Sequence, residues 1–325
     1  MLKNRSSLKT VVEAFDPTRP IVVSVIVDTF NHANYLKENL DSILSQRVNF
    51  NIEILIHDDC SKDNTQEIIR GYERKYPQII KPIYQIENQF SKGIEIDAAF
   101  NYPRIKGQYV AMCEGDDKWI DDYKLFKQTN YLNKHPKISA YIAKTIRYNM
   151  RDNKYGFYGL AVDRRSKKYT LKDLIKGKDF SVSSFLARRE FFVPPFPEFI
   201  NLFVGFTDIQ LGYYFGLHNK IYYDCHPMSF YRQYSSQTSF TASFSKLDLD
   251  KKIRTYENRI RVLELLGDVI PSKYKKDLEK RIRLEKFTNL VIKNDVEALK
   301  SKEFRKMYNR KMRHEKIKHF LNINH

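Results

Sequence analysis

The chain has 325 residues and carries 57 Lys and Arg against 39 Asp and Glu, a formal net charge of +18. Its 42% hydrophobic and 14% aromatic content exclude a disordered polycation or a histone-like tail. Three scattered cysteines form neither a disulfide framework nor a zinc site, so we expect a reducing, cytoplasmic setting. The longest clean apolar run, Ile21 to Val27, is far shorter than the ~20 residues of a membrane span. Any membrane contact is therefore expected from outside the bilayer core.

Up to residue 245, short apolar runs alternate with segments of helical spacing. Strands are predicted at Ile21–Val27, Ile52–His57 and Tyr109–Cys113, and helices over Leu36–Leu44, around Ile68–Tyr72 and over Leu125–Leu132. This alternation predicts an α/β fold, with a Rossmann-like, mostly parallel sheet and helices on both faces. Such sheets bind ligands at the carboxyl ends of their strands. The residues that follow each strand are therefore the first candidates for a site.

The last quarter of the chain has a different character. Residues 246–325 hold 23 Lys and Arg against 12 Asp and Glu, which is more than half of the net charge. Ile253, Tyr256 and Ile260 recur on one helical face, and Gly267–Pro271 is predicted to separate this helix from a second one that begins near Ser272. We expect a C-terminal helical appendage, either simply solvated or docked through its basic faces on an anionic membrane.

Polar and acidic residues follow all three predicted strands. They are Asp28-Thr29-Phe30-Asn31, Asp58-Asp59-Cys60-Ser61 and Glu114-Gly115-Asp116-Asp117. Taken alone, the second group could cap the next helix through Ser61 or Asp63. The three carboxylates of the third group repel one another unless a cation joins them, and Mg²⁺ or Mn²⁺ prefers oxygen ligands that it shares with phosphates. The chain has no glycine-rich phosphate loop, so the pattern indicates a metal held against a nucleotide diphosphate.

These three motifs carry a resemblance to a known family. In chain order, Val23–Asn31, His57–Thr65 and Cys113–Trp119 resemble glycosyltransferase family 2. The resemblance is dense over residues 20–135 and looser up to about residue 240. It implies a GT-A fold and the displacement of a nucleotide diphosphate from an activated sugar, with inversion at the anomeric carbon. It does not specify the sugar.

The resemblance also implies a set of donor-binding residues. The nucleotide-sugar is expected to contact Thr29, Phe30, Asn31, Asp59, Glu114, Gly115, Asp116, Asp117, Trp119 and Arg232. Among these, Asp59 would read the pyrimidine base. Asp116 would hold Mn²⁺ or Mg²⁺ against the diphosphate, with Glu114 beside the metal or the ribose. The motif usually begins with Asp, so Glu114 is a departure from the family pattern.

The reaction also needs a base that removes the proton of the acceptor hydroxyl while the metal stabilises the departing diphosphate. The segment Gly205–Leu211 resembles the one that supplies this base, which makes Asp208 the expected residue. Thr207 stands where an acidic residue or Gly is usual. Asp208 could at the same time cap the helix that follows it.

Two later features complete the expected site. The segment Tyr231–Ser239 resembles one that closes over the donor phosphates, with Arg232 as a phosphate partner and Tyr234 in place of the usual His. Trp119 is expected to form a wall of the sugar or acceptor pocket rather than to fill the core. His226 lacks metal-ligand spacing and is not expected to bind the metal.

We therefore expect an N-terminal extension (1–20), a glycosyltransferase domain (21–245) and a basic helical region (246–325). The domain would divide into a nucleotide-binding half (21–135) and an acceptor-binding half (136–245). The predicted function is metal-dependent, inverting transfer of a hexosyl or N-acetylhexosaminyl group, from a UDP-sugar more readily than another donor. The acceptor would be a hydroxyl of a glycan or lipid-linked molecule, in the biosynthesis of a bacterial surface polysaccharide such as capsule or lipopolysaccharide. Residues 246–325 could instead form a homo-oligomer interface.

Three alternatives remain open at this point. A nucleic-acid-binding protein would explain the basic charge and the aromatic content but not the carboxylate clusters, so nucleic acid is not the expected partner. A sugar nucleotidyltransferase would need a basic, glycine-rich segment after the first strand, where Asp28–Asn31 stands instead. A non-catalytic member of the glycosyltransferase fold would agree with the departures at Glu114 and Tyr234.

Overall fold

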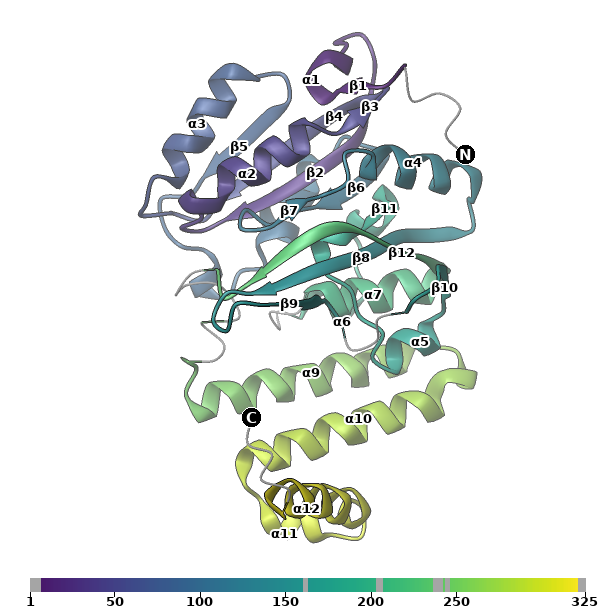
Figure 1. The fold of residues 1–325 in the computed structure, drawn as a ribbon. Coiled ribbons are helices and arrows are strands. Elements are labelled where there is room, and N and C mark those ends of the chain that lie inside the picture. Colours follow the sequence, from purple (N-terminus) through teal and green to yellow (C-terminus); the bar gives the residue numbers. More distant parts are fainter. Residues whose placement is uncertain (1–6, 160–162, 203–206, 236–241, 243–245, 321–325) are drawn as a thin grey trace. The chain divides into compact units, whose positions relative to one another are not determined.

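The computed structural model describes residues 7–159, 163–202, 207–235, 242 and 246–320. The chain divides into two compact units, residues 1–245 and 246–325 (Figure 1). The first unit contains a large β-sheet with helices, and the second is built from helices.

Among the described residues, ten strands of the first unit form one sheet (Figure 1). Its main path in space is β10-β12-β8-β11-β6-β2-β4-β5, with β7 beside β12 and β9 beside β8. The strands are β2 Ile21–Thr29, β4 Asn51–Asp58, β5 Ile80–Tyr84, β6 Tyr109–Met112, β7 Lys118–Trp119, β8 Ile138–Asn149, β9 Lys154–Phe157, β10 Lys167–Tyr169, β11 Leu186–Arg188 and β12 Lys220–Gln233. Ahead of this sheet, β1 Lys9–Thr10 pairs with β3 Arg47–Val48, next to the short helix α1 Val11–Ala14.

The part of the first unit that covers residues 21–135 contains the predicted elements. Strands β6, β2, β4 and β5 pair in parallel, so the alternation of strand and helix in the sequence was interpreted correctly. Helices α2 Ala33–Leu44, α3 Thr65–Lys75 and α4 Lys124–Lys134 confirm the three predicted helices. Alternate residues of β2, including Val23 and Val25, share one buried cluster with Leu36 and Leu40 of α2.

The opposite face of β2 and β4 is more polar. It is covered by a π-helical turn at Asp97–Asn101 and a 3₁₀ turn at Tyr102–Arg104. The side chain of Asn101 binds Asp28 at 2.9 Å, and the ring of His57 stacks on Phe100. Both faces of the sheet are therefore covered, as predicted.

The part of the first unit that follows residue 135 mixes strand directions. Strand β12 runs parallel to β8, while β11 lies antiparallel between β6 and β8. Its helices are α5 Leu171–Ile175, α6 Glu198–Asn201 and α7 Thr207–His218. The buried rings of Phe185 and Phe191 pack against Phe215 of α7.

The second unit contains α9 Leu249–Val269, α10 Ser272–Lys293, α11 Val296–Lys300 and α12 Arg305–Phe320. The break between the first two helices lies at Ile270 and Pro271, so Gly267 still belongs to α9 and the second helix begins at Ser272 as predicted. The buried carboxylate of Glu285 joins Arg259 of α9 to Arg281 of α10. This ion-pair network ties the two long helices together.

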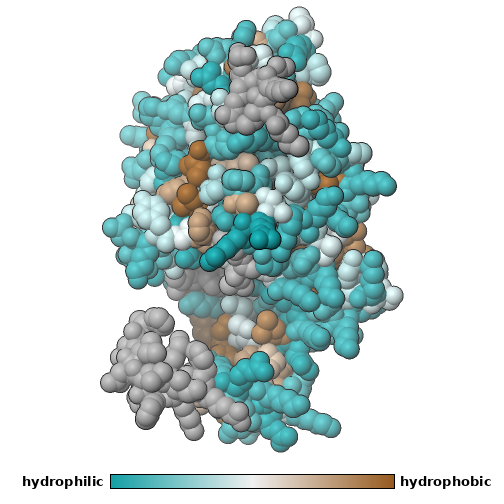
Figure 2. Space-filling view, turned by 45° about the vertical axis from the view of Figure 1, so that its right-hand side comes forward, coloured by the Kyte–Doolittle hydropathy of each residue, from teal (hydrophilic) through white to brown (hydrophobic). Residues whose placement is uncertain are grey.

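One face of the molecule can be described by its hydropathy. Figure 2 shows one face of the molecule, on which hydrophilic side chains predominate and apolar patches are small. Within the described part of the chain, no helix combines the length and the apolar character needed to cross a bilayer.

Candidate active site

The carboxyl ends of β2, β4 and β6 bring the three polar motifs together. The backbone N–H of Gly115 donates to the carbonyl oxygen of Asp28 at 2.9 Å, and the N–H of Asp59 donates to that of Thr29 at 3.0 Å. The Thr29 hydroxyl also lies 3.1 Å from the Asp58 carboxylate. The predicted convergence of the strand ends is therefore present.

The first two motifs are also joined through their loops. Asn31 adopts a left-handed backbone conformation (φ 57°), and its side-chain oxygen accepts from the Lys62 N–H at 2.8 Å. Its own N–H donates to the Ser61 hydroxyl at 2.9 Å. Thr29 is buried, whereas Phe30 and Asn31 are partly exposed, which leaves them accessible at this edge. Their contact with a nucleotide base stays a prediction.

The second motif contributes two carboxylates with different surroundings. Asp58 is fully buried and binds Ser61 and Gln66, so it has a structural role. Asp59 accepts from the backbone N–H of Gln89 at 2.7 Å and of Phe90 at 3.0 Å. In this structure Asp59 thus holds the loop that follows β5, and base recognition by Asp59 remains a prediction.

The third motif, Glu114–Asp117, is named here the acidic loop. Its backbone is held by Asn39, which is fully buried in α2 although its neighbours Leu36 and Leu40 form an apolar stripe. The Asn39 amide donates to the carbonyl oxygens of Glu114 at 2.8 Å and Asp117 at 3.0 Å. Asn39 is not among the predicted site residues. The sequence signal was a polar residue at a buried position of a predicted helix.

Strand β12 holds the acidic loop from the other side. The backbone N–H of Arg232 donates to Asp117 Oδ1 at 3.1 Å. The guanidinium of Arg232 donates to the Asp116 carbonyl oxygen at 2.5 Å and also to the carboxylate of Glu38. The Ser235 hydroxyl donates to Asp116 Oδ2 at 2.5 Å. In this structure the guanidinium of Arg232 binds Glu38 and the loop backbone, and its role as a phosphate partner stays a prediction. Arg232 and Glu38 position the acidic loop.

Gly115 is required by close packing. A Cβ atom at this position would lie 2.7 Å from Thr29 Cγ2 and 2.9 Å from His32 Nδ1, both far below a normal contact. The other ring nitrogen of His32, Nε2, lies 3.8 Å from Asp116 Oδ2. Gly115 therefore lets the acidic loop sit directly on the end of β2. His32 was not predicted, although it follows the first motif immediately.

The charges of the site repel one another. The protein packed around Glu114 raises the pKa of its carboxyl well above the usual range, although the side chain reaches solvent. Nearby carboxylates add to this shift; in decreasing order they are Asp116, Asp117, Asp28 and Asp208. Burial, followed by the charge of Asp116, likewise raises the pKa of Asp117.

This donor set fits a hard divalent cation. Its groups are carboxylate oxygens, the ligands that Mg²⁺ and Mn²⁺ prefer, and their mutual repulsion is relieved by a bound cation as well as by a proton. Glu114 and Asp116 are the carboxylates that would hold it. Asp117 is directed instead into the protein, toward the backbone of Arg232.

The expected base lies in the first turn of α7. Asp208 Oδ2 accepts a hydrogen bond from the Tyr158 hydroxyl at 2.9 Å. Gly205 and Phe206 of the same motif, and the Ser/Thr run after Ser235, lie outside the described residues. Tyr234 directly follows β12 and has a left-handed conformation (φ 61°), with the Arg151 guanidinium 4.0 Å from its ring centroid.

Trp119 is a wrong prediction. Its strand β7 pairs with β12, which carries the indole into the core, where Trp119 is only 4% exposed. The ring N–H donates to the Ser183 carbonyl oxygen at 2.9 Å, and the ammonium of Lys124 lies 4.2 Å from the ring centroid. Trp119 therefore fills the core instead of forming the wall of a sugar pocket.

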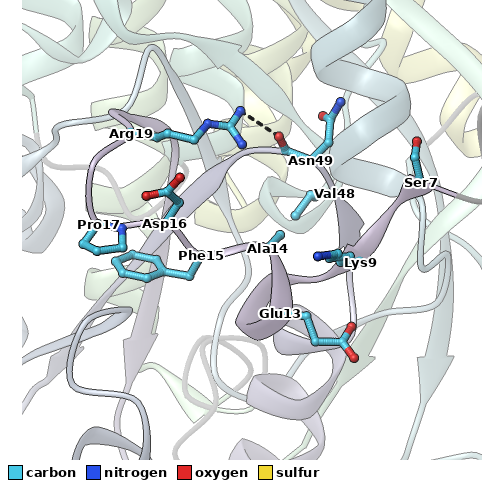
Figure 3. A pocket seen from close by; sticks show the side chains of 10 residues that line it. All are labelled: Ser7, Lys9, Glu13, Ala14, Phe15, Asp16, Pro17, Arg19, Val48 and Asn49. Carbon is cyan, nitrogen blue, oxygen red and sulfur yellow. Dashed lines mark hydrogen bonds between the residues drawn. The ribbon is translucent and has the colours of Figure 1, made fainter.

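Two other features of the described residues lie apart from this arrangement. Asp224, Cys225 and His226 come within 4.8 Å of one another. They lie in β12, next to a register shift in its pairing with β8, and the Asp224 carboxylate already accepts from Tyr141, Ser166 and His226. An open depression of about 470 Å³ is lined by Ser7, Lys9, Glu13, Ala14, Phe15, Asp16, Pro17, Arg19, Val48 and Asn49 (Figure 3). It lies where β2 and β4 begin, at the opposite ends of these strands from the acidic loop.

Comparison with known proteins identifies the family. The family model for glycosyl transferase family 2 matches residues 24–193, just over half of the chain. The chain belongs to glycosyl transferase family 2. Among curated relatives of this family, a Rickettsia prowazekii glycosyltransferase, RP339, is 28% identical over 68% of this chain and 67% of its own length. Rv1520 of Mycobacterium tuberculosis is 38% identical over 118 residues, which span only 33% of its length. TuaG of Bacillus subtilis, named for teichuronic acid biosynthesis, is 36% identical over 34% of this chain and 42% of its own length.

Solved glycosyltransferases share the fold. S. aureus TarS 1–349 in complex with UDP superposes with a TM-score of 0.54 at 17% identity, covering 82% of this chain and 90% of that one. The mannosyltransferase PcManGT from Pyrobaculum calidifontis, in complex with GDP-Man and Mn²⁺, gives a TM-score of 0.55 at 17% identity, covering 90% and 85%. The GT-A, α/β prediction with a C-terminal helical region is thereby confirmed, and the chain is a glycosyltransferase by family.

Proposed function

We propose that this protein is a metal-dependent inverting glycosyltransferase that moves a hexosyl or N-acetylhexosaminyl group from a UDP-sugar to a hydroxyl of a glycan or lipid-linked acceptor. The observation that supports the proposal most is the convergence of the three polar motifs at the carboxyl ends of β2, β4 and β6. There the backbone N–H groups of Gly115 and Asp59 donate to the carbonyl oxygens of Asp28 and Thr29.

Each group has a distinct task in this proposal. Asp208 accepts the proton of the attacking hydroxyl, and the hydrogen bond that it accepts from Tyr158 at 2.9 Å holds its carboxylate in place for this task. Glu114 and Asp116 would hold Mn²⁺ or Mg²⁺, which when bound would neutralise charge on the departing diphosphate. Thr29, Phe30, Asn31 and Asp59 would surround the nucleoside at the ends of β2 and β4.

The similar proteins differ in their donor nucleotides, and one of them supports a role in polysaccharide biosynthesis. TarS is solved with UDP and with UDP-GlcNAc, whereas PcManGT is solved with GDP-Man. The donor nucleotide is therefore the point that an experiment has to decide. TuaG, named for teichuronic acid biosynthesis, supports a role in a bacterial surface polysaccharide.

The test is a panel of UDP-, dTDP- and GDP-sugars, assayed for release of nucleoside diphosphate with Mn²⁺, Mg²⁺ or EDTA. We expect release from a UDP-sugar with metal, none in EDTA, and loss of at least 100-fold in Asp116→Ala. Asp152→Ala, at an exposed position, is the matched control and should behave as wild type. Release from GDP- or dTDP-sugars alone would overturn the UDP assignment, and full activity in EDTA would overturn the metal.

The second unit supports a membrane-facing role. Lys273, Lys276, Lys280 and Arg283 of α10 are all exposed and follow a 3-4-3 spacing, which places them on one helical face. Such a basic stripe suits the anionic surface where lipid-linked acceptors reside. We expect the protein to float with phosphatidylglycerol vesicles at low salt but not with phosphatidylcholine vesicles, and a fourfold Gln variant of the stripe to lose this binding. Unchanged binding by the variant, or none by the wild type, would overturn the membrane assignment.

A further inference from the structure

We propose that two neighbouring residues of β12, Tyr231 and Arg232, position the two halves of the site from opposite faces of the strand. Arg232 holds the acidic loop, and Tyr231 supports Tyr158, which in turn orients Asp208. The inference rests on the proposed function, because it concerns the residue proposed as the base.

The end of β12 is regular, so its side chains alternate between the two faces of the sheet. Tyr231 pairs with Arg147 and Arg232 with Tyr148 of the parallel strand β8, without a bulge between them. Arg232 stacks near Phe230 of its own face, 5.4 Å from the ring centroid, and reaches the acidic loop and Glu38. Tyr231 points to the other face, where it meets Tyr158.

On that face the contacts lead to Asp208. The rings of Tyr231 and Tyr158 meet edge to face, with centroids 5.1 Å apart and an interplanar angle of 86°. The backbone of Tyr158 is fixed because its N–H donates to the Thr145 carbonyl oxygen at 3.0 Å. Its hydroxyl then reaches Asp208 Oδ2 at 2.9 Å. Tyr231 thus restricts the ring that aims this hydroxyl.

The charges around Tyr158 fix the direction of the hydrogen bond. Burial, with the nearby carboxylates of Asp208 and Asp179 and the hydroxyl of Tyr231, raises the pKa of Tyr158 well above its usual value, so the hydroxyl keeps its proton and donates. The donated hydrogen bond holds one oxygen of the Asp208 carboxylate, which orients the group for the acceptor.

The test compares Tyr158→Phe, Tyr231→Leu and Arg232→Gln with Tyr155→Phe, a matched control at an exposed position of the same hairpin. The readouts are kcat, donor KM and the pH profile of metal-dependent nucleotide-sugar hydrolysis, together with the thermal shift given by UDP and Mn²⁺. We expect Tyr158→Phe to lower kcat about 10-fold, keep donor KM within twofold and move the acid limb of the profile upward by about one pH unit. Tyr231→Leu should act in the same direction with a smaller effect.

Arg232→Gln should do the reverse: it should reduce the thermal shift by UDP and Mn²⁺ and raise donor KM, while the acid limb stays in place. Tyr155→Phe should match wild type in every readout. A Tyr158→Phe enzyme with wild-type kcat and pH profile, alongside an inactive Asp208→Asn enzyme, would overturn the positioning role and leave the base intact. Full activity of Asp208→Asn would instead overturn the base assignment in the proposed function.

Discussion

The two halves of the site are built in different ways. The acidic loop is fixed through its backbone, by the amide of Asn39 on one side and the guanidinium of Arg232 on the other. Asp208 is oriented through its side chain, by the hydroxyl of Tyr158. A loop held by its carbonyl groups keeps its shape whatever its carboxylates bind. A base held by a side-chain hydrogen bond can be tuned in pKa without a change of fold. Damage to the first half should therefore affect stability and donor binding, and damage to the second should affect the rate.

The largest effect that tests this difference is expected for Asn39→Ala. The buried carbonyl oxygens of Glu114 and Asp117 would lose their donor, at a cost of about 2 kcal/mol in the free energy of unfolding. We expect kcat/KM for the donor to fall at least 10-fold, mainly through KM. Urea unfolding and donor-hydrolysis kinetics check both effects.

The matched control is Asn34→Ala, at an exposed position of the same helix. It should change the free energy of unfolding by less than about 0.5 kcal/mol and leave the kinetics alone. If Asn39→Ala left donor KM unchanged while lowering kcat, the acidic loop would not depend on Asn39 for its shape. The proposed separation between the two halves would then fail.

The difference between the halves also explains what could be predicted from sequence. In β2, β4 and β6, apolar runs followed by polar residues identify buried parallel strands and their carboxyl ends, so the convergence of Asp28–Asn31, Asp58–Ser61 and the acidic loop was predictable. Asn39, Glu38 and Tyr158 were not predicted, because their roles arise from contacts between segments distant in the sequence. Asp208 was proposed only from the family resemblance.

One prediction failed for a physical reason. Trp119 was assigned as a pocket wall from its position beside a motif, but the pairing of β7 with β12 buries it. Arg232 was assigned as a phosphate partner, and the structure adds contacts of its guanidinium with Glu38 and with the backbone of the acidic loop. Neither the strand pairing nor the carboxylate on α2 can be inferred from local spacing.

A smaller effect is expected from Gly115→Ala. The added Cβ would meet Thr29 Cγ2 at 2.7 Å and His32 Nδ1 at 2.9 Å, so the acidic loop must move away from β2. We expect a loss of about 1–2 kcal/mol in the free energy of unfolding and a several-fold rise in donor KM. Gly71→Ala in α3 is the matched control: no atom lies within 4 Å of its added Cβ, and the change should stabilise the helix by about 0.5–1 kcal/mol. If the two variants had the same free energy of unfolding and the same donor KM, close packing at Gly115 would be unimportant.

The smallest expected effect concerns a carboxyl pair beside the acidic loop. Burial, followed by the charge of Glu95, raises the pKa of Asp28 to about 7. Burial, followed by the charge of Asp28, raises the pKa of Asp97 well above its usual value. The two carboxyl groups share a hydrogen bond. The folded chain thus keeps protons that the unfolded chain releases near pH 4, so folding stability falls as the pH rises from about 4 to 7. Asp97→Asn removes one acidic group and keeps the shape. The Tm of the Asp97→Asn protein should therefore exceed that of the wild type by about 2–4 °C at pH 8, and the two Tm values should be nearly equal at pH 5. Asp152→Asn, at an exposed position, should give the same Tm as wild type at both pH values, and an equal gain for Asp97→Asn at pH 5 and pH 8 would contradict the shared proton.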